Sequence, residues 1–336
     1  MQTDVVIIGA GPTGLFSIFQ CGMMGLKTHV IDALDFIGGQ CTALYPEKPI
    51  YDIPAYPVIT ADELTEKLRQ QSEPFNPVYH LGQQVTSIER IGEEWCVTTS
   101  KGTVVKAKGV IIAAGGGAFG PNRPPIPGIE TFETTSVFYA VRQKQHFANK
   151  RIVIAGGGDS AVDWAISLSE IAKSITMVHR RSNFRAAPES VSKLNVLAES
   201  GKIQLLTPYQ LSALEGVGSQ LTHVIIERLG ENQKRSLDAD ILLPFFGLQM
   251  DLGSIADWGL SLENKHIKVN PHTMETNLSN VFAVGDIATY PGKLKLILCG
   301  FSEVAISAHT LRANLFPETV FHFEYSTTKG IPKPTR

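Results

Sequence analysis

The chain has 336 residues, of which 43% are hydrophobic and 18% are charged, and its formal net charge at pH 7 is −2. This length is typical of about two domains, and the slightly negative charge argues against a nucleic-acid partner. The N-terminus lacks the positive region of a signal peptide, and the sequence has no run of about 20 apolar residues, so we expect a cytoplasmic protein without membrane contact.

The first predicted element is a buried parallel strand that leads into a glycine-rich turn. Residues 5–8 are apolar throughout, as a strand buried on both faces requires. The turn contains Gly9, Gly11, Pro12, Thr13 and Gly14. In dinucleotide-binding folds such glycines permit a tight turn, a close approach of backbone amides to a pyrophosphate, and packing of helix on strand. The N-terminus of the following helix then binds the phosphates.

A carboxylate follows the second predicted strand of this unit. Asp32 lies 23 positions after Gly9, directly behind the apolar segment 28–31. A carboxylate at this place accepts hydrogen bonds from a ribose diol, which an adenosine with a free 2′-hydroxyl provides. The first site is therefore predicted to bind FAD.

The chain between this unit and the next glycine motif contains further elements and a crossing between domains. Residues 62–71 are predicted to be helical, and residues 110–115 are predicted to be another buried strand that ends in glycines. Shorter alternating segments predict strands at 85–88, 95–99 and 104–106. The prolines after residue 120, which neither a helix nor a central strand tolerates, mark the crossing.

A second strand and glycine motif begins near residue 151. The motif contains Gly156, Gly157, Gly158, Asp159 and Ser160. His179 lies 23 positions after Gly156, as Asp32 does after Gly9, and it is followed by Arg180, Arg181 and Arg185. Planar guanidiniums suit a phosphate, so this site is predicted to bind the 2′-phosphate of NADPH. The alternative is a solvated basic turn.

The last part of the chain is predicted to return to the first domain. Residues 281–286 form a strand that ends in Gly285 and Asp286, where a carboxylate is well placed to bind a flavin ribityl chain or phosphate, although an ordinary turn aspartate is also possible. The predicted fold is α/β, with two Rossmann-like, three-layer ββα dinucleotide-binding domains. The FAD domain comprises residues 1–117 and 247–336, and the NADPH domain, 118–246, is inserted into it.

Several stretches in this order resemble one family of flavoproteins. The chain resembles the two-dinucleotide flavoprotein disulfide reductases in their thioredoxin-reductase-like form, and among them the bacterial ferredoxin–NADP⁺ reductases. The stretches that carry the resemblance are 38–52, 156–163, 179–186, 274–286 and 300–303.

The resemblance implies roles for further residues. Gly38, Gly39 and Gln40 would line the flavin, and Tyr45 would stack on one face of the isoalloxazine ring. Tyr325, in the C-terminal extension, would cover the other face across a homodimer, and a helix starting near 301–302 would direct its positive end at the pyrimidine edge. The other FAD-binding residues implied are Val85, Phe119, Asp286, Ser326 and Thr327. No catalytic side chain is expected, because the flavin, one per subunit, carries the chemistry.

The cysteine pattern separates this chain from the dithiol enzymes that it resembles. Its cysteines, Cys21, Cys41, Cys96 and Cys299, form no CxxC pair and no metal-binding cluster. The positions of the thioredoxin-reductase CxxC fall at Tyr139 and Arg142, and the fifth position after Cys41, where glutathione-reductase-like enzymes place a second cysteine, is Pro46. We therefore expect NADPH to reduce the flavin, and the flavin to pass single electrons directly to ferredoxin or flavodoxin.

Two other functions fit the same motifs. One is a thioredoxin-reductase-like oxidoreductase that lacks the dithiol and reduces quinones, oxygen or another small acceptor. The other is a redox-sensing protein that binds FAD and NADPH without turnover. A ferredoxin partner is acidic, and the candidate residues for a basic docking patch are Lys293, Lys295, Lys329, Lys333 and Arg336.

Overall fold

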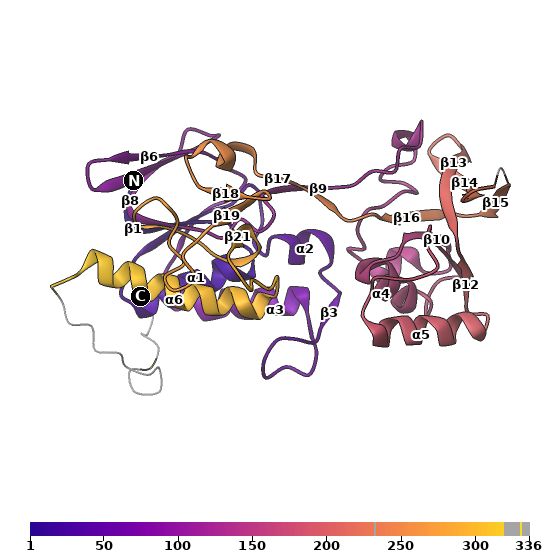
Figure 1. Ribbon diagram of the computed structural model, residues 1–336, viewed down its shortest axis with the longest axis horizontal. Helices are drawn as coiled ribbons and strands as arrows, with labels where there is room; N and C mark the ends of the chain where they lie inside the picture. The colour runs from indigo at the N-terminus through magenta and orange to yellow at the C-terminus, as the bar shows by residue number, and fades with distance from the viewer. Residues whose placement is uncertain (232, 319–329, 331–336) are drawn as a thin grey trace. The chain divides into compact units, whose positions relative to one another are not determined.

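In the computed structural model, which describes residues 1–231, 233–318 and 330, the chain divides into two compact units. One unit comprises Met1–Ala118 and the described part of Met250–Arg336, and the other comprises Phe119–Gln249 (Figure 1). The chain passes between the units through β9 (Ala118–Pro121) and β17 (Leu248–Asp251), which pair with each other. The second unit is therefore inserted in the sequence of the first.

A seven-stranded sheet forms the centre of the first unit. Its parallel strands are β5 (Val78–His80), β2 (Thr28–Ile31), β1 (Gln2–Ile8), β8 (Val104–Ile112) and β20 (Val281–Ala283). The long strand β8 pairs with β20 through residues 110–112, and with antiparallel β7 (Glu94–Thr99) through residues 104–107. Strand β6 (Val85–Ile91) then pairs with β7.

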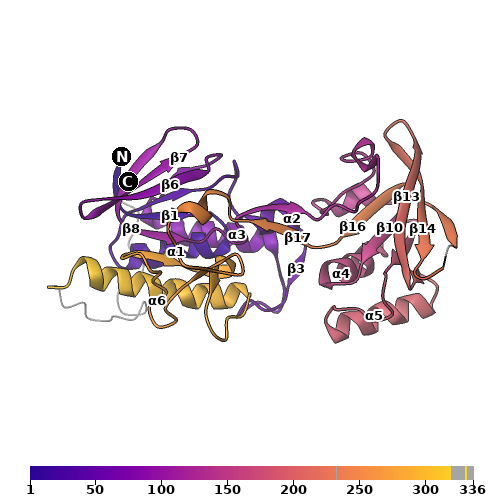
Figure 2. The ribbon, with the colours of Figure 1, turned by 45° about the horizontal axis from the view of Figure 1, so that its top comes forward.

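Alternate residues of β1 belong to two different hydrophobic cores, one on each face of the sheet. Val5 and Ile7 belong to a core shared with residues of α1 (Pro12–Met23), α3 (Ala61–Ser72) and α6 (Ile297–Leu315). Val6 and Ile8 belong to a second core, shared with β6, β7 and the segment after β17. Figure 2 shows the helices on one side of β1 and β8 and the β6–β7 hairpin on the other. An uninterrupted apolar strand is the consequence of burial on both faces.

Short elements complete the first unit. They are α2 (Gln40–Leu44), β3 (Pro49–Ile50), β4 (Ile59–Thr60), β18 (Leu262–Glu263), β19 (His266–Lys268) and β21 (Ala288–Thr289), with 3₁₀ turns at Glu73–Phe75, Gly253–Asp257 and Gly285–Ile287. The expectation that a helix starts near 301–302 is wrong by one turn. Helix α6 begins at Ile297, where the backbone leaves the extended conformation of its N-cap residue, Leu296.

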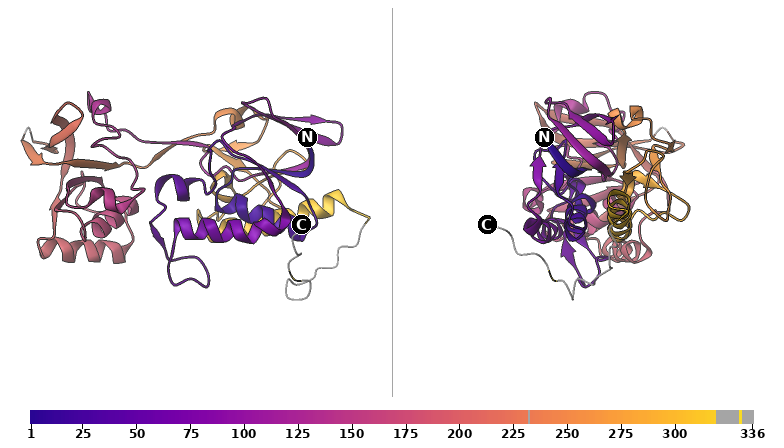
Figure 3. Two further views of the ribbon diagram at one scale, coloured as in Figure 1. Left: turned by 180° about the vertical axis from the view of Figure 1, so that it is seen from behind. Right: turned by 90° about the vertical axis from the view of Figure 1, so that its left-hand side faces the viewer.

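The second unit repeats the layered arrangement with its own sheet. Its parallel strands lie in the order β12 (Ile203–Leu206), β11 (Ser174–Val178), β10 (Arg151–Gly156) and β16 (Ile241–Phe245). Helices α4 (Asp159–Leu168) and α5 (Pro188–Glu199) pack against each other and against this sheet (Figure 3). The antiparallel strands β13 (Tyr209–Val217), β14 (Gln220–Arg228) and β15 (Lys234–Asp238) share a core with alternate residues of β10, and 3₁₀ turns lie at Ile129–Thr131 and Lys144–Phe147.

The layers in both units agree with the α/β fold class predicted from the sequence. In each unit a glycine motif follows the carboxyl end of a central parallel strand, β1 or β10, and precedes a helix. Open α/β sheets bind their ligands at this edge. The candidate site residues are therefore to be sought there.

Candidate functional site

The turn after β1 can be built only with glycine at two positions. Gly9 has φ +106°, and a Cβ added there would lie 2.4 Å from the carbonyl oxygen of Ala113. A Cβ on Gly14 would lie 1.9 Å from the carbonyl oxygen of Gly9, so α1 packs directly on the turn. Gly11 is the N-cap of α1 and Pro12 its first residue, and no side chain caps the helix. The first amides of α1 are thus left to bind an anion such as a pyrophosphate.

Asp32 connects the end of β2 to this turn. Its Oδ2 accepts a hydrogen bond from the amide of Ala10 at 2.6 Å, and its Oδ1 accepts one from the amide of Leu34 at 2.8 Å. Burial raises the pKa of Asp32, and these two hydrogen bonds act in the opposite direction. A carboxylate has about four acceptor positions, so Asp32 retains capacity for the two hydroxyls of a ribose.

The segment around α2 brings several predicted flavin-binding residues together. A Cβ added to Gly116 would lie 3.6 Å from Nε2 of Gln40, so the amide of Gln40 lies beside the glycine turn after β8. Cys41 Sγ donates to the Tyr45 hydroxyl at 3.8 Å, and the charge of Asp286 contributes to raising the pKa of both groups. Asp286 is therefore close enough for its charge to act on Cys41 and Tyr45, although it is far from them in the sequence.

Burial decides the chemistry of Cys41. The pKa of this thiol is raised to about 11, and burial is the largest cause. A thiol with this pKa stays protonated near neutral pH and is a poor nucleophile. All four cysteines lie within the described residues, and each is a free thiol.

Thr13 lies where three segments meet. A Cβ added to Gly300 would lie 2.7 Å from Oγ1 of Thr13, and a Cβ added to Gly285 would lie 3.1 Å from the same atom. Gly285 has φ +74°, so it is suited to glycine on conformational grounds as well. The first turn of α1, the turn after β20 and the first turn of α6 therefore pack closely together.

Of the remaining predicted FAD-binding residues, two lie in strands β6 and β9, and three are outside the residues that the structure describes. The Val85 side chain is buried in the core on the β6–β7 side of the sheet, and its carbonyl oxygen accepts from Ser254 Oγ at 2.6 Å. Phe119 lies in β9. Tyr325, Ser326 and Thr327 are outside the described residues.

The second glycine turn is covered by the segment that contains the predicted NADPH-binding residues. A Cβ added to Gly156 would lie 2.6 Å from the carbonyl oxygen of Phe245, and one added to Gly157 would lie 2.2 Å from the ring of His179. Gly158 is the N-cap of α4, and Ser160 lies in the first turn of that helix. The Arg185 amide donates to the Gly157 carbonyl at 2.7 Å, and the Asp159 carboxylate accepts from the Ala187 amide at 2.9 Å.

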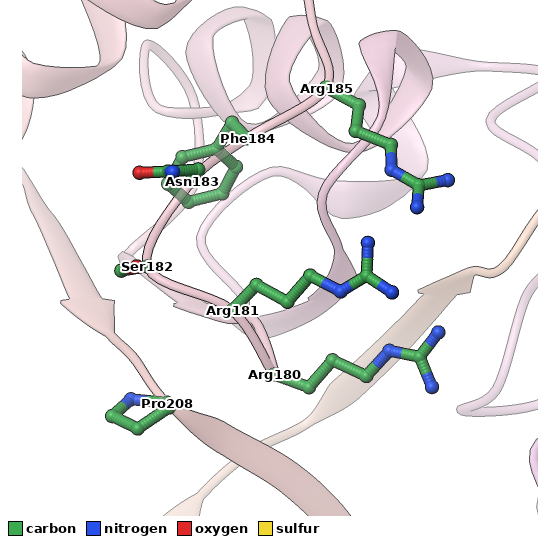
Figure 4. A pocket seen from close by; sticks show the side chains of 7 residues that line it. All are labelled: Arg180, Arg181, Ser182, Asn183, Phe184, Arg185 and Pro208. Atoms are coloured by element: carbon green, nitrogen blue, oxygen red, sulfur yellow. The ribbon is translucent and has the colours of Figure 1, made fainter.

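Three guanidiniums lie beside this covered turn. Figure 4 shows the side chains of Arg180, Arg181 and Arg185 extending in the same direction. Together with Ser182, Asn183, Phe184 and Pro208, they line a pocket of about 580 Å³. Three forked donors side by side can neutralise and bind a doubly charged phosphate.

His179 contributes a neutral ring to the same place. Burial, and then the charges of the three arginines, lower the pKa of His179, and the ring stacks on Phe184 with centroids 5.1 Å apart. Its Nε2 is buried without a hydrogen-bond partner among the described residues. This nitrogen is therefore available to accept from a ligand hydroxyl.

The residues of both turns fit dinucleotides. In the first unit, the tight turn that Gly9 and Gly14 permit, the uncapped N-terminus of α1 and the Asp32 carboxylate suit a pyrophosphate and a ribose diol. In the second unit, the arginines and the orphaned His179 nitrogen suit a phosphorylated ribose. No group of three or more potential metal ligands is found among the described residues.

The structure corrects one expectation about the surface. The Lys293 side chain is only 6% exposed and forms an ion pair with Glu303, which is 2% exposed, so Lys293 cannot belong to an exposed docking patch. Lys295 is exposed, whereas Lys329, Lys333 and Arg336 are outside the described residues. Glu303 has no predicted role, although a glutamate beside Val304 on the buried face of a helix is a signal of a buried polar contact.

Comparison with known proteins agrees with two dinucleotide sites. The sequence model of the family described as "Pyridine nucleotide-disulphide oxidoreductase" matches residues 3–303. The chain is 58% identical over 335 residues to a protein of Rickettsia rickettsii (strain Iowa) named ferredoxin–NADP reductase, with 100% of this chain and 98% of that protein covered. It is 59% identical over 328 residues to the ferredoxin–NADP reductase of Rickettsia akari (strain Hartford), with 98% of each covered.

Solved structures share the fold. The thioredoxin reductase of T. acidophilum superposes with a TM-score of 0.81 at 21% identity, over 94% of this chain and 99% of that one. The thioredoxin reductase of Lactococcus lactis superposes with a TM-score of 0.80 at 25% identity, over 94% of this chain and 100% of the other. None of the described helices is long and apolar enough to span a membrane.

Proposed function

Since this chain belongs to the pyridine nucleotide-disulphide oxidoreductase family, we propose that it is a ferredoxin–NADP⁺ reductase that uses FAD and NADPH. The observation that carries the proposal is the identity of about 58%, over the whole chain, with relatives that have this name. The site geometry supports it, because one glycine turn is followed by a carboxylate and the other by three arginines. These are the two kinds of ribose site that FAD and NADPH need.

FAD would be held by the first unit. The first turn of α1 would bind its pyrophosphate and Asp32 its ribose, while Gln40, Tyr45 and Asp286 would lie at the flavin and ribityl end. The full set of proposed FAD-binding residues is Gly9, Gly11, Pro12, Thr13, Gly14, Asp32, Gln40, Tyr45, Val85, Phe119, Asp286, Ser326 and Thr327. Tyr45 and Tyr325 would stack on the two faces of the ring, Tyr325 from the partner subunit of a homodimer.

NADPH would be held by the second unit. The turn from Gly156 to Ser160 would bind the pyrophosphate, and Arg180, Arg181 and Arg185 would bind the 2′-phosphate. His179 would accept a hydrogen bond from a ribose hydroxyl through its unpartnered nitrogen. A neutral ring suits this role, since it can accept a hydrogen bond there and a protonated ring cannot.

The electron carrier would be a separate protein. Bound FAD supplies the conversion between a hydride and single electrons. The chain has no internal disulfide that could take electrons from the flavin, because its four cysteines are free thiols. Tyr139 and Arg142 stand at the positions of the thioredoxin-reductase CxxC. Ferredoxin or flavodoxin in the cytoplasm would then exchange electrons with the flavin directly.

The test is NADPH-driven reduction of cytochrome c by the purified protein, with and without ferredoxin. Reduction that depends on ferredoxin, and that thioredoxin cannot replace, is expected. Rapid flavin reduction by NADPH without any effect of ferredoxin would contradict the proposed acceptor and point to quinones or oxygen. Absence of turnover with every acceptor would point to a redox sensor.

A further inference from the structure

A buried ion pair lies next to the proposed flavin site, and the function described above does not use it. Glu303, in α6, is 2% exposed, and the Lys293 side chain is 6% exposed. Glu303 Oε1 accepts from Lys293 Nζ and, at 2.7 Å, from the Tyr290 hydroxyl. Burial, and then the Glu303 carboxylate, raise the pKa of Tyr290, so this phenol stays protonated and donates.

The other oxygen of Glu303 holds the backbone of the turn after β20. Glu303 Oε2 accepts from the amide of Gly285 at 2.7 Å, inside the protein. Gly285 precedes Asp286, whose charge acts on Cys41 and Tyr45. Glu303 therefore fixes the Val284–Gly285 peptide, one residue before the carboxylate that is proposed to bind the ribityl chain.

Packing against Thr13 also restrains this turn. Gly285 and Gly300 both lie against Thr13, in the first turn of α1. The turn is thus held between the helix that would bind the pyrophosphate and the helix that carries Glu303. A displacement of Gly285 would move Asp286 relative to Thr13.

Stability alone does not account for this ion pair. Desolvation of two buried charges costs about as much as their attraction returns, and apolar replacements of such pairs are often neutral or stabilising. What the pair adds is a hydrogen-bond acceptor, Glu303 Oε2, at a fixed position for the buried amide of Gly285. Lys293 neutralises the charge that this acceptor brings into the interior.

We propose that Lys293 and Glu303 are a positioning pair for FAD: through the Gly285 amide they hold the turn that presents Asp286 to the cofactor. The inference rests on the proposed use of FAD. It predicts that the hydrogen bond to Gly285, and not the ion pair itself, determines how tightly FAD binds.

Two double variants separate these contributions. Lys293→Met with Glu303→Leu removes both charges and the acceptor for the Gly285 amide. Lys293→Met with Glu303→Gln removes both charges but keeps an acceptor oxygen on a side chain of nearly the same shape. Single substitutions are avoided, since each would leave one buried charge unpaired and destabilise the fold.

The measurements are the dissociation constant of FAD from the apoprotein, by flavin fluorescence, and the thermal unfolding midpoint of the apoprotein. The Met–Leu variant is expected to raise the dissociation constant at least tenfold and to shift the absorption bands of bound flavin. Its unfolding midpoint should be lower than that of the wild type, because the Gly285 amide and the Tyr290 hydroxyl lose their acceptor. The Met–Gln variant is expected to bind FAD within about threefold of the wild type.

A control pair lies in the second unit. Arg151 and Asp240 form an ion pair at 2.6 Å at the start of β10, and Arg151→Met with Asp240→Leu should change stability without changing FAD affinity. Wild-type affinity in the Met–Leu variant would overturn the inference, as would equal weakening in both double variants. Failure of the wild-type apoprotein to bind FAD would overturn the proposed function itself, and the inference with it.

Discussion

Asp32 and His179 each follow the second parallel strand of their unit, β2 or β11, and they differ in charge. Asp32 is a carboxylate that accepts from two backbone amides and can accept from a ribose diol. Burial and three arginines lower the pKa of His179, which keeps it neutral. A carboxylate at position 179 would repel the 2′-phosphate, whereas a neutral ring leaves the arginines free to bind it. In the proposed site, the choice between nucleotides would therefore be made at this position and at its neighbours.

Substitution of one of these arginines should weaken NADPH binding selectively. Arg181→Ala is expected to lower kcat/KM for NADPH about tenfold or more, because a charge-assisted hydrogen bond contributes about 1.5–3 kcal/mol. The value for NADH should change less than about twofold, since NADH lacks the phosphate. Steady-state kinetics with both nucleotides measure this. Arg235→Ala, at an exposed position of β15 in the same unit, is the control, and an equal loss with NADH would refute the assignment.

The pairing of β2 with β5 creates a histidine pair beside the proposed ribose site. His29 Nδ1 lies 3.0 Å from His80 Nε2, and the His80 carbonyl accepts from the Asp32 amide at 3.1 Å. Burial, then the charge of His80, then the N-terminal amine lower the pKa of His29, and burial and the amine lower that of His80. One proton can bridge the two rings, whereas two protons repel each other.

This pair predicts that the apoprotein loses stability in mild acid. A group with a lowered folded pKa contributes its stability above the unfolded pKa, and that stability is lost as pH falls from about 6.5 through the folded pKa. The urea midpoint should therefore be lower at pH 5.5 than at pH 7.5. His80→Gln should reduce this difference, and His272→Gln, at an exposed position, should not. The pKa values of His179 and His309 are also lowered, so part of the difference should remain.

Elements with local signals were predictable from the sequence, and contacts between distant segments were not. The helix predicted at 62–71 is α3, which Thr60 and Glu63 cap reciprocally, and the apolar run 5–8 lies within β1. The histidine pair joins residues 51 positions apart and exists only because β2 and β5 are parallel neighbours. The exposure predicted for Lys293 is wrong, because its carboxylate partner is placed by the packing of α6 against α1.

For the whole molecule, two sheets with separate cores each present one dinucleotide turn, and no thiol pair connects them to an acceptor. Burial raises the pKa of Cys21 to about 12, and burial is also the largest cause that raises that of Cys41 to about 11. Since the thiolate is the reactive form, Cys41 should react about a hundredfold more slowly than a thiol with the ordinary pKa. Partly exposed Cys96 and Cys299 should react first.

The thiols therefore provide a test of the electron route. Iodoacetamide should label Cys96 and Cys299 before Cys21 and Cys41, as peptide mass spectrometry would show, and ferredoxin-dependent activity should persist after this labelling. Prior reduction with NADPH should leave both the labelling and the activity unchanged, because no disulfide is opened. A thioredoxin reductase with its CxxC pair, treated in parallel, should instead be inactivated only after NADPH reduction. Inactivation of the present protein in that NADPH-dependent way would show that a cysteine takes part in electron transfer, and direct transfer from flavin to ferredoxin would have to be abandoned.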